Sequence, residues 1–128
     1  MMKFHVPIEV EPRLVADLIT TALEGGSNYW CMLRSTNDFK TEPTKHLTYW
    51  EALVENLEKG YDFHVPVYDA EEDHEILGRL SISTIKQGLR LFAQDHTDEF
   101  VEWATSENYD AGVADIAFQL MVMGEVTY

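Results

Sequence analysis

The spacing of the hydrophobic residues changes several times along this chain, and these changes limit the folds that it can adopt. Alternation of apolar and polar residues predicts strands at residues 4–10, 61–67 and 76–82. A further segment, residues 27–34, is apolar without clean alternation, and we expect it to form a short, largely buried strand. Elsewhere apolar residues recur at intervals of three and four, which is typical of helices that bury one face.

Residues that start and stop helices divide the helical segments. Helix starts are predicted at five positions, Pro12, Thr48, Ser83, Thr97 and Asp110. At Thr48 the prediction is strengthened by Glu51, which completes a capping box. Glycines at positions 25–26, 60 and 124 predict helix ends, residues 35–47 read as a loop, and residues 126–128 are expected to add a short terminal strand. The predicted fold is α+β, with a small, mainly antiparallel sheet of three to four strands and four to five helices.

A chain of 128 residues is expected to form a single domain, residues 1–128, whose core needs no covalent cross-link. The single cysteine, Cys31, excludes an intramolecular disulfide and is typical of a reducing compartment. No apolar run approaches the ~18 residues of a membrane-spanning helix, and the first residues do not resemble a signal peptide. These features predict a cytoplasmic protein that does not enter a membrane.

The charge of the chain is strongly negative and unevenly distributed. The sequence holds 9 Lys and Arg against 23 Asp and Glu, for a net charge of −14. Arg90 is the last basic residue, so the eight acids that follow it have no Lys or Arg nearby in sequence. Binding to a nucleic-acid backbone or to an anionic membrane surface is therefore disfavoured, because both require several cations. A protein partner with a basic surface fits this charge.

Part of this acidic segment is predicted to form an interaction surface. Its residues lie in two segments expected to be helical: Asp95, Asp98, Glu99, Glu102 and Glu107. The pairs Asp95/Glu99 and Asp98/Glu102 place like charges four residues apart, which costs a helix a few tenths of a kcal/mol. Solubility alone would not require that arrangement, although a solvated helix face is the simpler explanation of an acidic run.

No catalytic or metal-binding motif occurs in the sequence. The five histidines show no HxH or HExxH spacing, and Cys31 lies between the apolar residues Trp30 and Met32. No phosphate-binding glycine loop precedes a helix. The sequence therefore favours a non-enzymatic function, with no catalytic residue, metal ligand or cofactor predicted.

Two groups of residues are candidates for a binding site. Asn28, Tyr29 and Trp30 form an aromatic cluster that either packs in the core or stacks a ligand. Asp115 and Gln119 are neighbours on one face of the last predicted helix. They mark either the solvent-facing side of that helix or a polar patch within the fold, and the solvent-facing side is favoured.

Two segments of the chain resemble a known group of proteins. The first is Thr20–Trp30, which reads TTALEGGSNYW. The second is Ala114–Leu120, which reads ADIAFQL, and it continues to GEVTY at the end of the sequence. They are similar to small, uncharacterised proteins encoded in bacteriophage and prophage genomes. Leu23 stands where a bulkier aromatic residue is common in that group. The resemblance covers about a quarter of the chain. It implies a phage origin but no activity, and if the two segments meet in space, Tyr29, Trp30, Asp115 and Gln119 would lie together.

Two functions are consistent with these observations. The first is a non-enzymatic phage accessory protein that acts by binding, such as an acidic inhibitor of a host defence or nucleic-acid-handling protein. Its acidic surface would imitate the phosphate backbone in front of a basic groove. The alternative is a protein that binds or sequesters a small, nucleotide-like ligand in an aromatic pocket. The oligomeric state is left open, and a dimer is compatible with the sequence.

Overall fold

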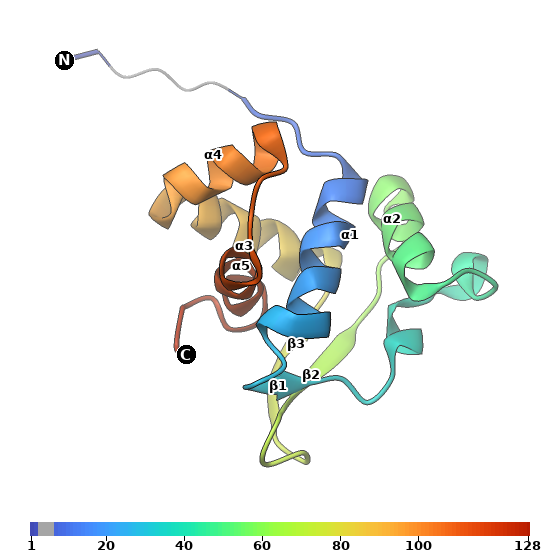
Figure 1. The fold of residues 1–128 in the computed structure, drawn as a ribbon. Helices are drawn as coiled ribbons and strands as arrows, with labels where there is room; N and C mark the ends of the chain where they lie inside the picture. Colours follow the sequence, from blue (N-terminus) through green and yellow to red (C-terminus); the bar gives the residue numbers. More distant parts are fainter. Residues whose placement is uncertain (3–6) are drawn as a thin grey trace.

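The structure is a computed structural model that describes residues 1–2 and 7–128 (Figure 1). The described chain forms five α-helices and three strands: α1 (Pro12–Thr21), β1 (Cys31–Met32), α2 (Tyr49–Lys59), β2 (Val65–Asp69), β3 (Ile76–Leu80), α3 (Ile82–Asp95), α4 (Thr97–Ser106) and α5 (Ala111–Met123). A π-helical turn (Ala22–Gly26) extends α1. The predicted α+β class is confirmed.

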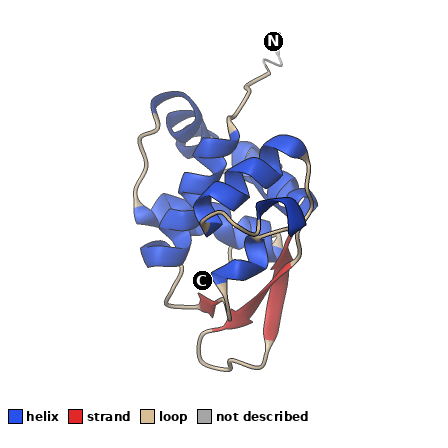
Figure 2. Cartoon of the chain, turned by 90° about the vertical axis from the view of Figure 1, so that its right-hand side faces the viewer, coloured by secondary structure: helices blue, strands red, loops and turns tan. Residues whose placement is uncertain are grey.

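The three strands form one antiparallel sheet in the order β1-β2-β3. Cys31 pairs with Asp69 at one edge, and β2 pairs with β3 from Val65 opposite Leu80. The helices gather on one side of this sheet, which lies at one end of the molecule (Figures 1 and 2). Val65 and Val67 are fully buried, as the alternation in this segment predicts.

Helix caps explain most of the element boundaries. Thr48 and Glu51 form the predicted capping box, in which each side chain accepts a hydrogen bond from the other's backbone amide. The side chain of Asp110 accepts the amide of Val113 at 2.9 Å, which confirms the predicted start of α5. Gly60 and Gly124 end α2 and α5 with φ of 75° and 76°, a left-handed conformation that suits glycine.

Two predicted helix starts were wrong by one or two residues. Ser81, not Ser83, caps α3, because its extended backbone lets its hydroxyl accept the amide of Thr84. Thr97 does not cap α4, since its hydroxyl donates to the carbonyl of Ala93 in the preceding turn. The chain bends instead at His96, which separates α3 from α4.

The strand predictions need several corrections. Of the predicted strand 4–10, Phe4 and Val6 lie outside the described residues, and 7–10 has no strand partner within the described chain. In the segment 27–34 only Cys31–Met32 is a strand, because the preceding residues form a hydrogen-bonded turn. Residues 126–128 are not a strand, and the predicted loop 35–47 contains two short 3₁₀ helices, Thr36–Phe39 and Glu42–Thr44.

The core lies between the sheet and the helices and draws on all five of them. Helix α5 runs through its middle and is buried over most of its circumference from Ala114 to Val122. It packs closely on α3, where a Cβ on Gly88 would lie 2.5 Å from the Cα of Met121. A second cluster, of Phe92, Phe100 and Trp103, joins α3 to α4 through ring contacts.

Candidate functional site

The Asp115 network joins the segment Thr20–Trp30 to the segment Ala114–Leu120. We use this name for Asp115 and its four side-chain donors, Ser27, Tyr29, Trp30 and Gln119. Oδ1 of Asp115 accepts the hydroxyl of Ser27 and the indole N–H of Trp30, each at 2.7 Å. Oδ2 accepts the hydroxyl of Tyr29 at 2.7 Å and the amide of Gln119 at 3.1 Å. The predicted meeting of Tyr29, Trp30, Asp115 and Gln119 is therefore what the structure shows.

The favoured expectation that Asp115 and Gln119 face solvent was wrong. Asp115 is 8% exposed and Gln119 is fully buried. Helix α5 lies in the centre of the molecule, so it has little solvent-facing side on which to place polar groups. A buried carboxylate is costly unless it is hydrogen-bonded, and here four neutral donors surround it instead of a cation.

Gln119 connects this network to the C-terminal residues. Its Oε1 accepts the backbone amides of Thr127 and Tyr128 at 2.9 and 2.8 Å. The ring of Tyr128 then stacks on Trp30, with centroids 5.1 Å apart, and meets Tyr29 edge-on. Trp30 is 3% exposed, so of the two alternatives for this aromatic cluster Trp30 follows core packing, whereas Tyr29 is 58% exposed.

The network and its burial change two acid–base equilibria. The pKa of Tyr29 is raised to about 12, mainly because its hydroxyl donates to the Asp115 carboxylate. Burial, reinforced by the negative charge of Asp115, raises the pKa of the Cys31 thiol to about 12. Both groups stay protonated at neutral pH, and Cys31 therefore lacks the thiolate that a nucleophile requires.

Alkaline pH is expected to destabilise the protein through Cys31. The unfolded thiol loses its proton near its ordinary pKa of 9.0, whereas burial raises the pKa of the folded thiol to about 12. The stability that this difference contributes is complete below about pH 9 and is lost as pH rises towards 12. Denaturant unfolding between pH 8 and pH 11 measures the decline, and Cys31→Ala is expected to show a shallower one. Identical pH profiles for the two proteins would contradict this role of the thiol.

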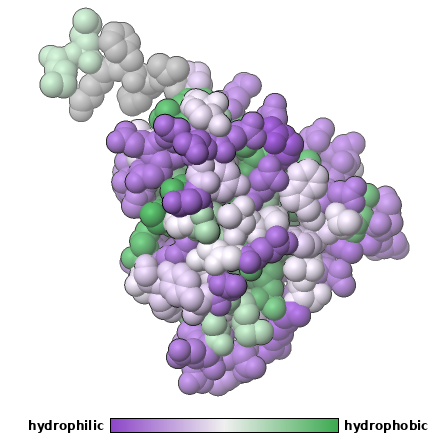
Figure 3. All heavy atoms as spheres, in the orientation of Figure 1, coloured by the Kyte–Doolittle hydropathy of each residue, from purple (hydrophilic) through white to green (hydrophobic). Residues whose placement is uncertain are grey.

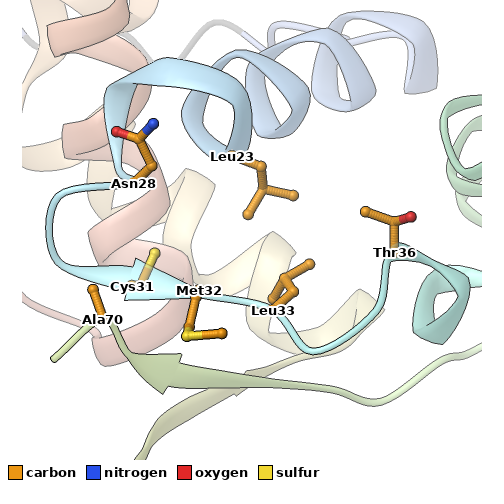
Figure 4. A pocket seen from close by; sticks show the side chains of 7 residues that line it. All are labelled: Leu23, Asn28, Cys31, Met32, Leu33, Thr36 and Ala70. Atoms are coloured by element: carbon orange, nitrogen blue, oxygen red, sulfur yellow. The ribbon is translucent and has the colours of Figure 1, made fainter. Parts of the chain in front are cut away.

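Asn28 lies in a different place from the other predicted site residues. It borders a hollow of about 370 Å³ between the π-helical turn and β1, together with Leu23, Cys31, Met32, Leu33, Thr36 and Ala70. Figure 4 shows Asn28 and Thr36 at opposite ends of this hollow, with Leu23 and Leu33 between them. No motif or spacing in the sequence indicated Thr36 or Ala70 as site residues.

The predicted acidic surface is reduced from five residues to four. Glu107 is not free, because Nη1 of Arg13 in α1 lies 3.0 Å from its carboxylate. Asp95, Asp98, Glu99 and Glu102 are exposed, and within residues 1–2 and 7–128 none of them has a basic group within 4.0 Å. We call these four the acidic surface. Asp95 ends α3 and Glu99 belongs to α4, so only Asp98 and Glu102 are an i,i+4 pair within one helix.

The acidic surface lies at the end of the molecule away from the sheet. In Figure 1 α4 lies at the upper left and β1 near the bottom. The same face in Figure 3 is mainly hydrophilic over the region of α4, with scattered apolar residues. Val101, an apolar residue of α4, is 39% exposed.

Two residues of this site were missed in the sequence, Ser27 of the network and Tyr128, which stacks on Trp30. Both belong to the segments that carry the resemblance, so the signal was present, but nothing in their spacing indicated a contact with α5.

Within the described residues no cluster of three or more His, Cys, Asp or Glu is arranged to hold a metal ion. The same part of the chain contains no helix long and apolar enough to cross a bilayer. No protein-family model, curated protein or solved structure matches the chain.

Proposed function

We propose that the chain is a non-enzymatic, cytoplasmic phage accessory protein that binds a basic surface on a host defence or nucleic-acid-handling protein. One observation carries this proposal: four exposed carboxylates at the junction of α3 and α4 lack a cationic partner within the described chain. Glu107 differs from these four, since Arg13 lies within 4.0 Å of Glu11, Asp17 and Glu107.

Helix electrostatics separate the four residues of the acidic surface into two kinds. Asp98 and Glu99 lie in the first turn of α4, where a negative charge stabilises a helix. Asp95 is the last residue of α3, where a negative charge opposes the helix dipole. Glu102 lies four residues after Asp98 and repels it. The positions of Asp95 and Glu102 therefore cost stability, which supports a role outside the fold.

The chemistry of the surface indicates the kind of partner. Closely spaced carboxylates attract lysine- or arginine-rich grooves such as those that bind a nucleic-acid backbone. Val101 lies between Glu99 and Glu102 in the sequence of α4 and is exposed, so it would add apolar contact area beside these acids. Binding of this kind is fast and weakens with salt, because exposed charges are screened within about 10 Å at 0.1 M ionic strength.

Neutralising the acidic surface is expected to weaken binding to a cationic partner. The test variant combines Asp95→Asn, Asp98→Asn, Glu99→Gln and Glu102→Gln. Its affinity for a fluorescent arginine-rich peptide is expected to fall by about 10-fold at low salt, because each exposed ion pair contributes roughly 0.2–1 kcal/mol. Fluorescence anisotropy at low and high salt measures the change.

A matched control separates a local surface from net charge. Glu58→Gln, Glu71→Gln, Glu72→Gln and Asp73→Asn remove the same number of exposed acids from α2 and from the β2–β3 turn. This control is expected to lose much less affinity than the test variant. Equal losses in the two variants would mean that only the total charge matters, and the proposed surface would then be rejected. The same pair of variants decides whether any purified host protein binds at this surface.

A further inference from the structure

The hollow beside Asn28 has the size and setting of a small-molecule site. Its volume of about 370 Å³ lies near the lower end of the range for ligand pockets. It is separate from the acidic surface, because it opens near β1 at the opposite end of the molecule in Figure 1. A ligand bound here would therefore be a second function, independent of the proposed protein partner.

Backbone hydrogen bonds hold the floor of the hollow in place. The amides of Trp30 and Cys31 both donate to the carbonyl of Ser27, at 3.1 and 3.2 Å. The amide of Ala70 donates to the carbonyl of Trp30 at 2.9 Å, and Cys31 pairs with Asp69 in the sheet. The Asp115 network fixes Ser27 and Trp30 from the other side. These contacts resist collapse of the hollow, and a preformed site loses less entropy when it binds.

An uncommon backbone conformation forms one wall. Leu23 projects from the π-helical turn Ala22–Gly26 towards Leu33 (Figure 4). Single π-helical turns are rare and frequently occur at functional sites. This turn is also held tightly against α5, since a Cβ on Gly26 would lie 2.4 Å from the carbonyl oxygen of Ala111. Leu23 is thus presented by a rigid wall.

The lining residues indicate the chemistry of the ligand. None of them is a charged residue, and the raised pKa of Cys31 keeps its thiol neutral. Leu23 and Leu33 offer apolar contact from two facing sides (Figure 4), and Met32 lies at the edge of the hollow. The amide of Asn28 and the hydroxyl of Thr36 make no hydrogen bond with any described residue, so both can bond to a ligand. The side-chain amide of Asn28 has a hydrogen-bond donor beside an acceptor. This pair is complementary to a neighbouring acceptor and donor on the edge of a heterocyclic ring or on a carboxamide.

We propose that this hollow binds a neutral, planar small molecule that has an amide-like edge. The apolar ring lies between Leu23 and Leu33, and its donor–acceptor edge bonds to Asn28. Two sources share this chemistry, a nucleobase and an aromatic carboxamide. Phosphorylated or carboxylated forms bind poorly, because the hollow offers no cation and the protein is strongly negative.

The experiment uses adenine and benzamide as probes, with benzoate as the charged counterpart of benzamide. Binding is followed in the full chain through the NMR signal of the Met32 methyl group, which is assigned with Met32→Leu. Ligands of roughly ten heavy atoms are expected to bind with millimolar affinity. A saturable shift with adenine, benzamide or both supports the proposal and identifies the source. Benzoate is expected to bind at least about 10-fold more weakly than benzamide.

Three variants test the location. Asn28→Ala is expected to weaken binding about 5-fold, the effect of one lost hydrogen bond. Asn108→Ala, in the exposed α4–α5 loop, is the matched control and is expected to bind as the unmodified chain does. Ala70→Phe fills the hollow and is expected to abolish the shift, with folding checked by its melting temperature. The proposal is overturned if neither neutral probe gives a saturable shift at 10 mM, if benzoate binds as well as benzamide, or if Asn28→Ala binds normally.

Discussion

Replacing Asp115 with Ala is expected to lower the free energy of unfolding by about 3–5 kcal/mol. The substitution removes the acceptor of four side-chain hydrogen bonds at once. Ser27, Trp30 and Gln119 are buried, so their donors would be left without either water or a partner. Denaturant unfolding, monitored by tryptophan fluorescence, measures the loss.

A second carboxylate on the same helix provides the control. Asp110 caps α5 with a single hydrogen bond to the amide of Val113 and is exposed. Asp110→Ala is therefore expected to cost only about 1 kcal/mol. Asp115→Asn keeps the shape of the side chain and one carbonyl acceptor, so its cost is expected to fall between the two. If Asp115→Ala costs no more than Asp110→Ala, the network does not stabilise the fold in the way argued above.

Gly88→Ala is expected to destabilise the protein by about 2–4 kcal/mol, even though alanine is the better helix former by about 1 kcal/mol. The added Cβ would lie 2.5 Å from the Cα and 2.6 Å from the backbone nitrogen of Met121. Backbone atoms in the centre of α5 cannot move aside without separating α3 from α5. Thermal unfolding and circular dichroism measure the effect.

Gly25→Ala is the matched substitution in a helical turn with free space. Nothing lies within 4 Å of the position that its Cβ would occupy. Alanine there is expected to leave stability unchanged or to raise it by up to about 1 kcal/mol, because it restricts the unfolded chain. Similar effects at positions 25 and 88 would show that helix propensity, and not the α3–α5 contact, determines the response.

Local signals in the sequence predicted the fold well where a single residue determines a boundary. Thr48, Asp110, Gly60 and Gly124 act as expected, because caps and left-handed turns depend on only a few neighbouring residues. Where two serines lie two residues apart, as at Ser81 and Ser83, either can serve as a cap. The backbone conformation at the end of the preceding strand then determines which serine caps the helix, and that conformation is not visible in the sequence.

Alternation predicted strands less well than caps predicted helices. Alternation shows that a segment could bury one face, but a strand also needs a neighbour with which to pair. Residues 65–69 find two such neighbours, β1 and β3, whereas residues 7–10 find none within the described chain. The start of β2 also differs from the prediction, since Phe63 is buried before the ladder begins.

The candidate site could be predicted only in part, because its contacts span long distances in sequence. The donors to Asp115 from the N-terminal segment lie 85 to 88 residues away from it. Periodicity places Asp115 and Gln119 on one face of a helix but does not tell whether that face meets water or protein. The resemblance drew attention to the two segments, and only the three-dimensional arrangement showed that they meet and that Tyr128 covers Trp30.

The Asp115 network also has an evolutionary consequence. Each of its members is satisfied by the others, so a change at one position is tolerated only together with changes at its partners. Lineages are therefore expected to keep or replace these residues as a set, while the acidic surface and the lining of the hollow diverge freely. Two proteins that share the motif would then have inherited a common framework, and they could still differ in what they bind.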